Sequence, residues 1–417
     1  MIDITIVFRI FFCYYFPMFT PSKKILENYA KVMIDFALGK GKGVKKGQVV
    51  YLQYDSEALP LALAVYKRIL EKGAHPMVKG IEESFQKAMY ETASDDQLKF
   101  FPKEYTQSLV NTIDHRIYLI APTDPFLLKN IDPKKVMVSN SGDKRLLRKW
   151  LFEKEDQGKL TWTLCLYGTE GMAKESHLSL KDFWQEIINA CFLEAKDPIK
   201  VWEKTFAEIN VLKKKLNDLP VDTYHMVSEK TDLYIKLGKN RRWQGGGGAN
   251  IPSFEIFTSP DWRGVNGKIF FNFPLYRYGN IIENIQLEFK NGIVIKATAD
   301  KNEKLLKEMI SQKNANKIGE FSLTDKRFSK ISKFMANTLY DENFGGDFGN
   351  SHLAVGTSYH DCFSGDVKKM KSKDWEKLGF NESVEHCDII NTNEKTVEAI
   401  LKDGSKKVIY KNGKFVI

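Results

Sequence analysis

The hydrophobic pattern of the 417-residue chain changes character near residue 219. Before that point short apolar runs alternate with longer amphipathic segments, as in the run at 48–54, the helical spacing over 56–72 and the next run at 76–79. Two strands joined through a helix make a βαβ unit, whose strands are parallel and whose helix covers one face of the sheet. The first half of the chain is therefore predicted to be an α/β domain with a mostly parallel sheet.

Four more segments extend this pattern. Apolar runs at 116–121 and 162–167 are predicted to be further buried strands of the sheet. Amphipathic spacing predicts helices over 179–194 and 198–215. No GxGxxG motif occurs in the chain, so nothing indicates a dinucleotide-binding site.

The second half carries the alternation typical of an antiparallel sheet. Residues 223–228 and 232–237 alternate between apolar and polar side chains and are predicted to form a hairpin, and one helix is expected over 327–339. This half is predicted to be an α+β domain with a mainly antiparallel sheet, and it contains every candidate metal ligand. Three Asn-Gly pairs are predicted to be type I′ turns between strands, namely Asn266-Gly267, Asn291-Gly292 and Asn412-Gly413.

The start of the chain differs from the rest. It is apolar and aromatic, but charged residues interrupt it before it reaches the length of a bilayer span, and it lacks the basic start and cleavage site of a signal peptide. The first helix is expected over residues 21–38, with Thr20 as its N-cap and Pro21 at its first position. We therefore expect residues 1–17 to be a non-structural extension and translation to begin at Met18, with a membrane-associating segment as the alternative. Because a chain of this length exceeds what one core usually serves, the predicted domains are 18–219 and 220–417.

Charge and cysteine content narrow the class of protein. The net charge of +10 comes mostly from lysines spread along the chain, without the clusters of basic and aromatic residues that mark a nucleic-acid surface. The five cysteines are odd in number and lack CxxC spacing, which fits a reducing cytoplasm better than a disulfide framework. The expected protein is cytoplasmic and binds neither nucleic acid nor a membrane.

Three of the seven histidines fall between residues 352 and 386, close to several carboxylates. Imidazole nitrogens and carboxylates suit divalent first-row metals, and one carboxylate can bridge two ions. Each residue alone has an ordinary explanation, such as a buried hydrogen-bonded histidine or a surface carboxylate. His360 is expected to lie outside the ligand set. The candidate ligands are Glu255, Glu320, His352, His386 and Asp388.

Five segments in the same order resemble the thermophilic aminopeptidase T family, the M29 metallopeptidases. The resemblance runs from about Ile25 to the C-terminus. It implies that the five candidate ligands hold metal and that Tyr359 lies beside them in an active site. The segments that carry it are 250–260, Ile318-Gly-Glu320, 337–343, 351–356 and Glu385-His386-Cys387-Asp388.

The resemblance and the chemistry of the ligand set together predict a metal-dependent aminopeptidase. Two divalent ions per subunit are expected, zinc or cobalt first and magnesium or manganese as substitutes, since the ligand set does not select one metal. Glu320 is expected to bridge the ions and to act as the base, and Tyr359 to donate to the oxyanion. Trp243 and Gly246, in the glycine-rich segment before Glu255, are expected to face the peptide substrate. The family also implies a homodimer.

Two other functions remain open from the sequence. The same ligand types serve two-metal phosphodiesterases and nucleases, although no arginine cluster flanks the ligands to hold phosphates. A non-catalytic peptide-binding protein of the same fold is the other alternative, against which the complete ligand set argues.

Overall fold

A computed structural model of the protein describes residues 19–139 and 144–417. The expected extension at 1–17 and the expected start at Met18 lie outside the described residues. The first helix comprises α1 (Lys23–Lys31) and a π-helical continuation (Val32–Ala37), which confirms the expected extent. Its N-cap is Ser22 rather than Thr20, because the Ser22 hydroxyl accepts the hydrogen bond from the backbone N–H of Ile25.

A five-stranded parallel sheet forms the centre of the first half, as the sequence predicted. Its strand order is β2-β1-β3-β4-β7, so β2 is an edge strand. Strand β7 comes from the second half of the chain and pairs with β4. The boundary near residue 219 therefore stays a prediction, since the sheet draws on both sides of it. The strands are β1 (Val49–Asp55), β2 (His75–Ile81), β3 (His115–Ile120), β4 (Thr161–Leu166) and β7 (Asn250–Ile251).

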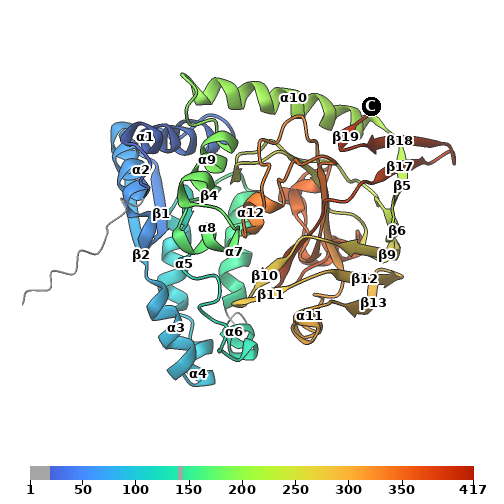
Figure 1. The fold of residues 1–417 in the computed structure, drawn as a ribbon, viewed down its shortest axis with the longest axis horizontal. Helices are drawn as coiled ribbons and strands as arrows, with labels where there is room; N and C mark the ends of the chain where they lie inside the picture. Colours follow the sequence, from blue (N-terminus) through green and yellow to red (C-terminus); the bar gives the residue numbers. More distant parts are fainter. Residues whose placement is uncertain (1–18, 140–143) are drawn as a thin grey trace, which may run out of the picture.

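Helices surround this sheet, and one of them joins the two halves. Figure 1 shows α10 (Pro198–Asp218) along the top of both the helical half and the strand-rich half. Within the described part of the chain, no helix is both long and apolar enough to cross a membrane. The other helices here are α2 (Leu59–Glu71, after a 3₁₀ turn at Ser56–Ala58), α3 (Glu83–Thr92), α4 (Asp95–Lys99), α5 (Lys103–Thr112), α6 (Pro133–Ser139), α7 (Lys144–Asp156), α8 (Glu170–Glu175) and α9 (Leu180–Ala190).

The second half is built on antiparallel strands, which confirms the predicted fold class. An eight-stranded sheet has the order β13-β12-β9-β6-β5-β17-β18-β19, and a four-stranded sheet has the order β16-β15-β14-β8. Short helices α11 (Glu303–Ile310), α12 (Thr338–Asp341) and α13 (Ser372–Lys377) lie between the strands. The strands are β5 (Val221–Ser228), β6 (Thr231–Lys236), β8 (Glu255–Thr258), β9 (Val265–Phe271), β10 (Leu275–Arg277), β11 (Asn280–Ile282), β12 (Ile285–Lys290), β13 (Ile293–Thr298), β14 (Ile318–Thr324), β15 (Asn350–Gly356), β16 (His386–Asn391), β17 (Thr396–Leu401), β18 (Lys406–Lys411) and β19 (Lys414–Phe415).

Two of the three predicted Asn-Gly turns are confirmed. Asn291-Gly292 joins β12 to β13 and Asn412-Gly413 joins β18 to β19, with positive φ at all four residues, as a type I′ turn requires. Asn266-Gly267 is not a turn and lies inside β9. Gly267 is needed there for another reason: a Cβ on it would lie 2.2 Å from the carbonyl oxygen of Asp232 in β6.

The prediction of a helix over 327–339 is wrong. Within that stretch only the first residues of α12 are helical. Polar side chains in the stretch form hydrogen bonds that compete with a helix. The Ser329 hydroxyl donates to the carbonyl of Asn343, and Ser332 donates to Glu186 of α9 through both its backbone N–H and its hydroxyl. These contacts fix the segment as an irregular connection against α9.

Candidate metal centre

The four-stranded sheet brings all five candidate ligands together. Glu255 begins β8, Glu320 lies in β14, His352 in β15, and His386 and Asp388 in β16. Because side chains alternate across a strand, His386 and Asp388 at a spacing of two share one face of β16. The neighbouring strands β15 and β14 place the histidine and the central carboxylate between the two edge strands of this sheet.

One group of three donor atoms is formed by Glu255, Glu320 and His352, whose ligand atoms all lie within 4.8 Å of one another. The Nε2 atom of His352 is 3.1 Å from Oε1 of Glu320 and 3.2 Å from Oε2 of Glu255. Donor atoms bound to one zinc ion at about 2.1 Å are separated by about 3–3.5 Å. The three side chains are therefore spaced as ligands of a single ion.

A second group is formed by Glu320, His386 and Asp388, again within 4.8 Å. The Nε2 atom of His386 is 3.6 Å from Oε2 of Glu320 and 3.4 Å from Oδ1 of Asp388. Glu320 therefore belongs to both groups and presents a different oxygen to each. A carboxylate in this position can bridge two ions.

The hydrogen bonds around the donors also fit a metal. Nδ1 of His386 lies 2.8 Å from the carbonyl oxygen of Thr357, so this nitrogen donates and the lone pair of Nε2 faces the carboxylates. Oδ1 of Asp388 is buried without a hydrogen-bond partner among the described residues. Buried polar atoms are nearly always paired. A buried carboxylate oxygen that forms no hydrogen bond to the described residues, 3.4 Å from the Nε2 atom of an oriented imidazole, is the donor set that a divalent cation would complete.

The charges of the cluster favour the binding of a cation. Burial, together with the nearby charge of Glu255, raises the pKa of Glu320 to about 7. Burial by itself would also raise the pKa of Asp388, but the charges of His386 and His352 lower it to about 2. Burial lowers the pKa of His352, yet its hydrogen bonds to the two glutamates raise it well above its usual value. Carboxylates packed this closely are stable only with compensating cations.

Tyr359 lies beside the cluster. Its ring is 4.8 Å from the imidazole of His386, centroid to centroid, in an edge-on arrangement. The backbone N–H of Tyr359 donates a 2.8 Å hydrogen bond to the hydroxyl of Ser259. Burial and the charges of Glu320 and Asp388 raise its pKa well above the usual value. The phenol is therefore neutral and able to donate a hydrogen bond.

The structure describes the surroundings of the two residues that are expected to face the substrate. Trp243 is only 1% exposed, and its indole N–H donates to the hydroxyl of Tyr224 at 2.7 Å. This burial argues against a contact between Trp243 and a substrate and indicates a packing role. Gly246 has a φ of +65°, and a Cβ on it would contact Phe206 and Ile209 of α10. Its expected contact with the substrate stays a prediction.

Two residues near the cluster were not anticipated from the sequence. Glu342 is buried, and its pKa is raised well above the usual value by burial and by the charges of Glu255 and Asp388. It belongs to the segment 337–343 that carries the family resemblance, so that motif was the available signal. Arg148 of α7 donates to the carbonyl of Val384 at 3.3 Å. No pattern in the sequence indicates this contact.

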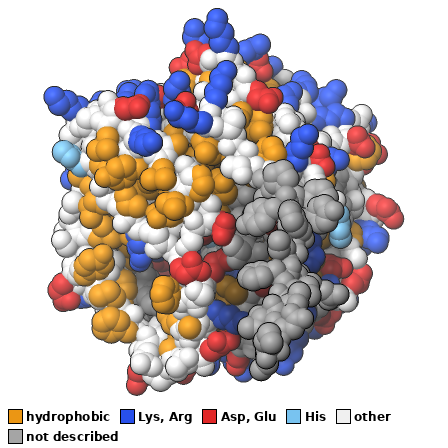
Figure 2. Space-filling view, turned by 60° about the vertical axis from the view of Figure 1, so that its left-hand side comes forward, with side chains coloured by type: hydrophobic (Ala, Val, Ile, Leu, Met, Phe, Trp, Pro, Cys, Tyr) orange, Lys and Arg blue, Asp and Glu red, His pale blue; other side chains and the backbone are white. Residues whose placement is uncertain are grey.

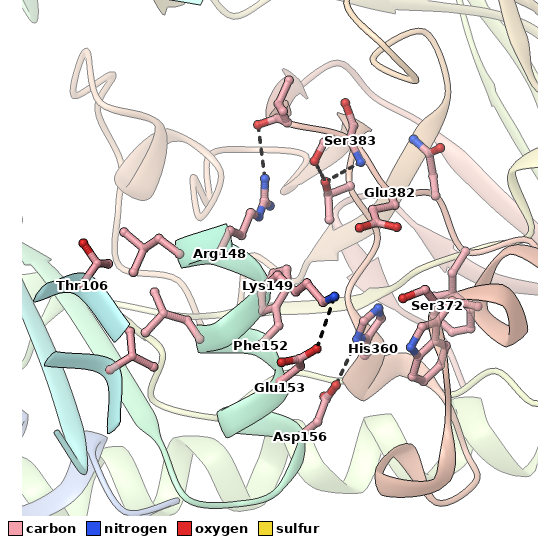
Figure 3. A pocket seen from close by; sticks show the side chains of 18 of the residues that line it. Thr106, Arg148, Lys149, Phe152, Glu153, Asp156, His360, Ser372, Glu382 and Ser383 are labelled. Carbon is pink, nitrogen blue, oxygen red and sulfur yellow. Dashed lines mark hydrogen bonds and ion pairs between the residues drawn. The ribbon is translucent and has the colours of Figure 1, made fainter. Parts of the chain in front are cut away.

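A cavity of about 1300 Å³ lies between α7 and residues that flank the ligand strands, such as Thr357 and Val384, while the five ligands themselves do not line it. Figure 3 shows Arg148 and Asp156 of α7 facing Ser383 and His360 across it. His360 pairs with Asp156 at 3.1 Å and stacks on Trp375, so it lies outside the ligand set, as expected. The cavity can admit a ligand of the size of a short peptide.

Comparisons with known proteins identify the family of this chain. A family model described as thermophilic metalloprotease (M29) matches residues 22–415. Aminopeptidase AmpS of Bacillus subtilis (strain 168) is 28% identical over 410 residues, which cover 93% of this chain and 97% of that protein. Aminopeptidase PepS of Streptococcus thermophilus is 26% identical, over 95% of this chain and 98% of that protein.

The fold also has a counterpart among solved structures. Wild-type AmpT from Thermus thermophilus superposes with a TM-score of 0.80 at 24% identity, over 95% of this chain and 100% of that chain. At this identity the likeness establishes the shared fold. Since the family model spans nearly the whole sequence, the chain belongs to the thermophilic metalloproteases of family M29.

Proposed function

We propose that the protein is an aminopeptidase that removes N-terminal residues from peptides and uses two divalent ions per subunit. The observation that carries this proposal is the pair of donor groups that share Glu320. The relatives named aminopeptidases support the reaction, and the family match favours peptide hydrolysis over phosphodiester hydrolysis. Zinc or cobalt is the proposed metal, with magnesium or manganese as substitutes.

Each residue of the centre is assigned one part of the reaction. When bound, divalent ions supply a water of lowered pKa and polarise the scissile carbonyl. Glu320 would bridge the two ions, because it belongs to both donor groups, and is proposed to accept the proton of that water. Tyr359 donates its phenolic proton in a hydrogen bond to the oxyanion of the transition state. The free α-amine of the substrate is proposed to bind at a metal or beside a carboxylate of the site, which selects a free N-terminus.

We further propose a cytoplasmic homodimer. The four described cysteines are free and buried, which fits a reducing compartment. Figure 2 shows hydrophobic side chains gathered on the face formed by α2, β2 and α3. The large exposed apolar residues of these three elements are Leu59, Leu63, Tyr66, Leu70, Met77, Val78, Phe85 and Met89. An apolar patch of this kind marks a protein interface.

A panel of fluorogenic aminoacyl amides, assayed with the full-length protein, tests the proposal. Chelation is expected to abolish hydrolysis, and restoring zinc or cobalt is expected to recover it. Glu320→Ala is expected to lower kcat/KM by at least about 10³-fold, because both donor groups and the base are lost. Metal analysis of the loaded protein should give two ions per chain, and fewer in the variant.

The matched control is Glu203→Ala, a glutamate exposed on α10. It is expected to keep the activity and metal content of the unaltered protein. Full activity of the metal-free protein or of Glu320→Ala would overturn the proposed function.

A further inference from the structure

The cavity beside the metal centre carries an excess of positive charge. Lysine and arginine side chains line it at eight positions, and aspartate and glutamate at four. Lys149 and Glu153 of α7 pair with each other at 3.8 Å, so they contribute little net charge. The surplus of cations favours an anionic group on whatever ligand enters. The basic residues are Lys79, Arg116, Arg148, Lys149, Lys313, Lys317, Lys371 and Lys373.

Arg148 is the cation of this set that lies next to the metal centre. Its guanidinium donates to the carbonyl of Val384, two residues before the ligand His386. Two residues of chain span at most about 7 Å. The charge of Arg148 also acts on the pKa of both Tyr359 and His386. The guanidinium therefore bonds to the segment that leads directly into the ligand strand β16 and lies within electrostatic reach of the centre.

Most of the hydrogen-bonding capacity of Arg148 is unused. Among the described residues, the carbonyl of Val384 is its one acceptor, and no carboxylate forms an ion pair with it. A guanidinium has five N–H donors in a planar fork that matches a carboxylate. Burial lowers the pKa of Arg148, but an arginine remains charged at neutral pH. Figure 3 shows its side chain extending across the cavity from α7 towards the segment that contains Ser383.

We propose that Arg148 binds the C-terminal carboxylate of short peptides whose N-terminus lies at the metal centre. This inference rests on the proposed aminopeptidase function and narrows its substrates to dipeptides and tripeptides. An extended peptide advances about 3.3–3.6 Å per residue, so two or three residues bring the carboxylate into the cavity. A substrate in which an uncharged amide replaces the carboxylate leaves the guanidinium without its partner.

The experiment compares dipeptides with and without the terminal carboxylate, on the metal-loaded full-length protein. Each dipeptide is paired with its C-terminal amide, and the N-terminal residue is taken from those accepted in the aminoacyl amide panel. The unaltered protein is expected to prefer the free acid by about 10- to 100-fold in kcat/KM, mostly through KM, since a hydrogen bond to a charged group is lost in the amide. Arg148→Met is expected to reduce this ratio to near 1, and Arg148→Lys to an intermediate value because the fork is lost.

The control variant is Lys181→Met, which removes one positive charge from an exposed position of α9 outside the cavity and is expected to keep the preference. A third substrate, an amide with glutamate as its second residue, reports whether a side-chain carboxylate is recognised instead. If Arg148→Met lowers kcat/KM equally for the free acid and the amide, the inference is overturned. It is also overturned if Arg148→Met lowers kcat/KM more for the amide with a glutamate side chain than for the free acid. An unaltered protein that does not prefer the acid would also overturn it, even if no variant folds. Chelator-sensitive hydrolysis of the aminoacyl amides tests the proposed function separately.

Discussion

At the level of single side chains, the position of Tyr359 separates binding from catalysis. If its phenol donates only to the developing oxyanion, it stabilises the transition state and contributes little to ground-state binding. Tyr359→Phe is expected to lower kcat and kcat/KM together by about 10²- to 10³-fold while KM stays nearly constant. Metal content should equal that of the unaltered protein. Tyr234→Phe, a change on the exposed face of β6, serves as control. Loss of metal from Tyr359→Phe would instead place the phenol among the metal ligands.

Another single side chain makes stability depend on pH. Lys395 is 2% exposed, and its Nζ has no hydrogen-bond partner among the described residues. Burial lowers its pKa to about 7, compared with about 10.4 in the unfolded chain. Between these pH values the unfolded chain binds more protons than the folded chain, so this lysine makes stability rise with pH across the window. At and below pH 7 the folded protein holds a buried, unpaired charge.

Lys395→Met is therefore expected to increase the free energy of unfolding at pH 7, and the increase should shrink as the pH approaches 10.5. Urea unfolding of both proteins at pH 7, 9 and 10.5 measures this difference. Lys402→Met, at an exposed position, should give a small difference that does not vary with pH. A variant that is less stable than the unaltered protein at pH 7 would show that the ammonium group is stabilised in the fold.

At the level of strands and turns, Gly267 is required by a close approach of two strands. Its φ is +114°, and a Cβ would lie 2.2 Å from the carbonyl oxygen of Asp232. Gly404 has a φ of +85°, but no heavy atom beyond its chain neighbours lies within 4 Å of its Cβ position. We expect Gly404→Ala to cost about 1–2 kcal/mol through backbone strain alone. Gly267→Ala should cost clearly more, because β6 must also move; equal midpoints of urea unfolding would contradict this.

The same comparison shows how far the sequence could predict the fold. Strands with apolar runs or strict alternation, such as β1 and β5, begin and end within two residues of the predicted limits. The predicted helix over 327–339 failed because Ser329 and Ser332 bond to distant partners that no local pattern contains. Asn266-Gly267 carries a turn signal, but the contact with β6 decides its conformation.

The candidate site was predictable where it depends on motifs and hidden where it depends on packing. Glu320, His386 and Asp388 lie in motifs that carry the family resemblance, and the structure brings them within 4.8 Å of one another. Arg148 is 236 residues from Val384 along the chain, so its approach to the site is a property of the tertiary structure alone. Trp243 lies near the first ligand in sequence, yet its side chain is buried in the core.

For the molecule as a whole, the exposed apolar face on α2, β2 and α3 bears on the proposed dimer. Leu59, Leu63, Tyr66 and Leu70 recur at helical spacing along one side of α2, and each is at least 37% exposed. Strand β2 beside them is the free edge of the parallel sheet. Such a face is stable in water when a second copy covers it.

Leu63→Lys combined with Leu70→Lys is therefore expected to convert a dimer into a monomer, because two charges would be buried without partners at the interface. Both side chains are about half exposed within one chain, at 51% and 50%, so the fold of the single chain should persist. Val211→Lys on α10 changes an equally exposed apolar residue, at 57%, outside this face and should leave the dimer intact. Sedimentation of the three proteins at micromolar concentration measures the outcome. A double variant that sediments as a dimer would move the interface to another face, and a monomeric unaltered protein would remove the dimer from the proposed function.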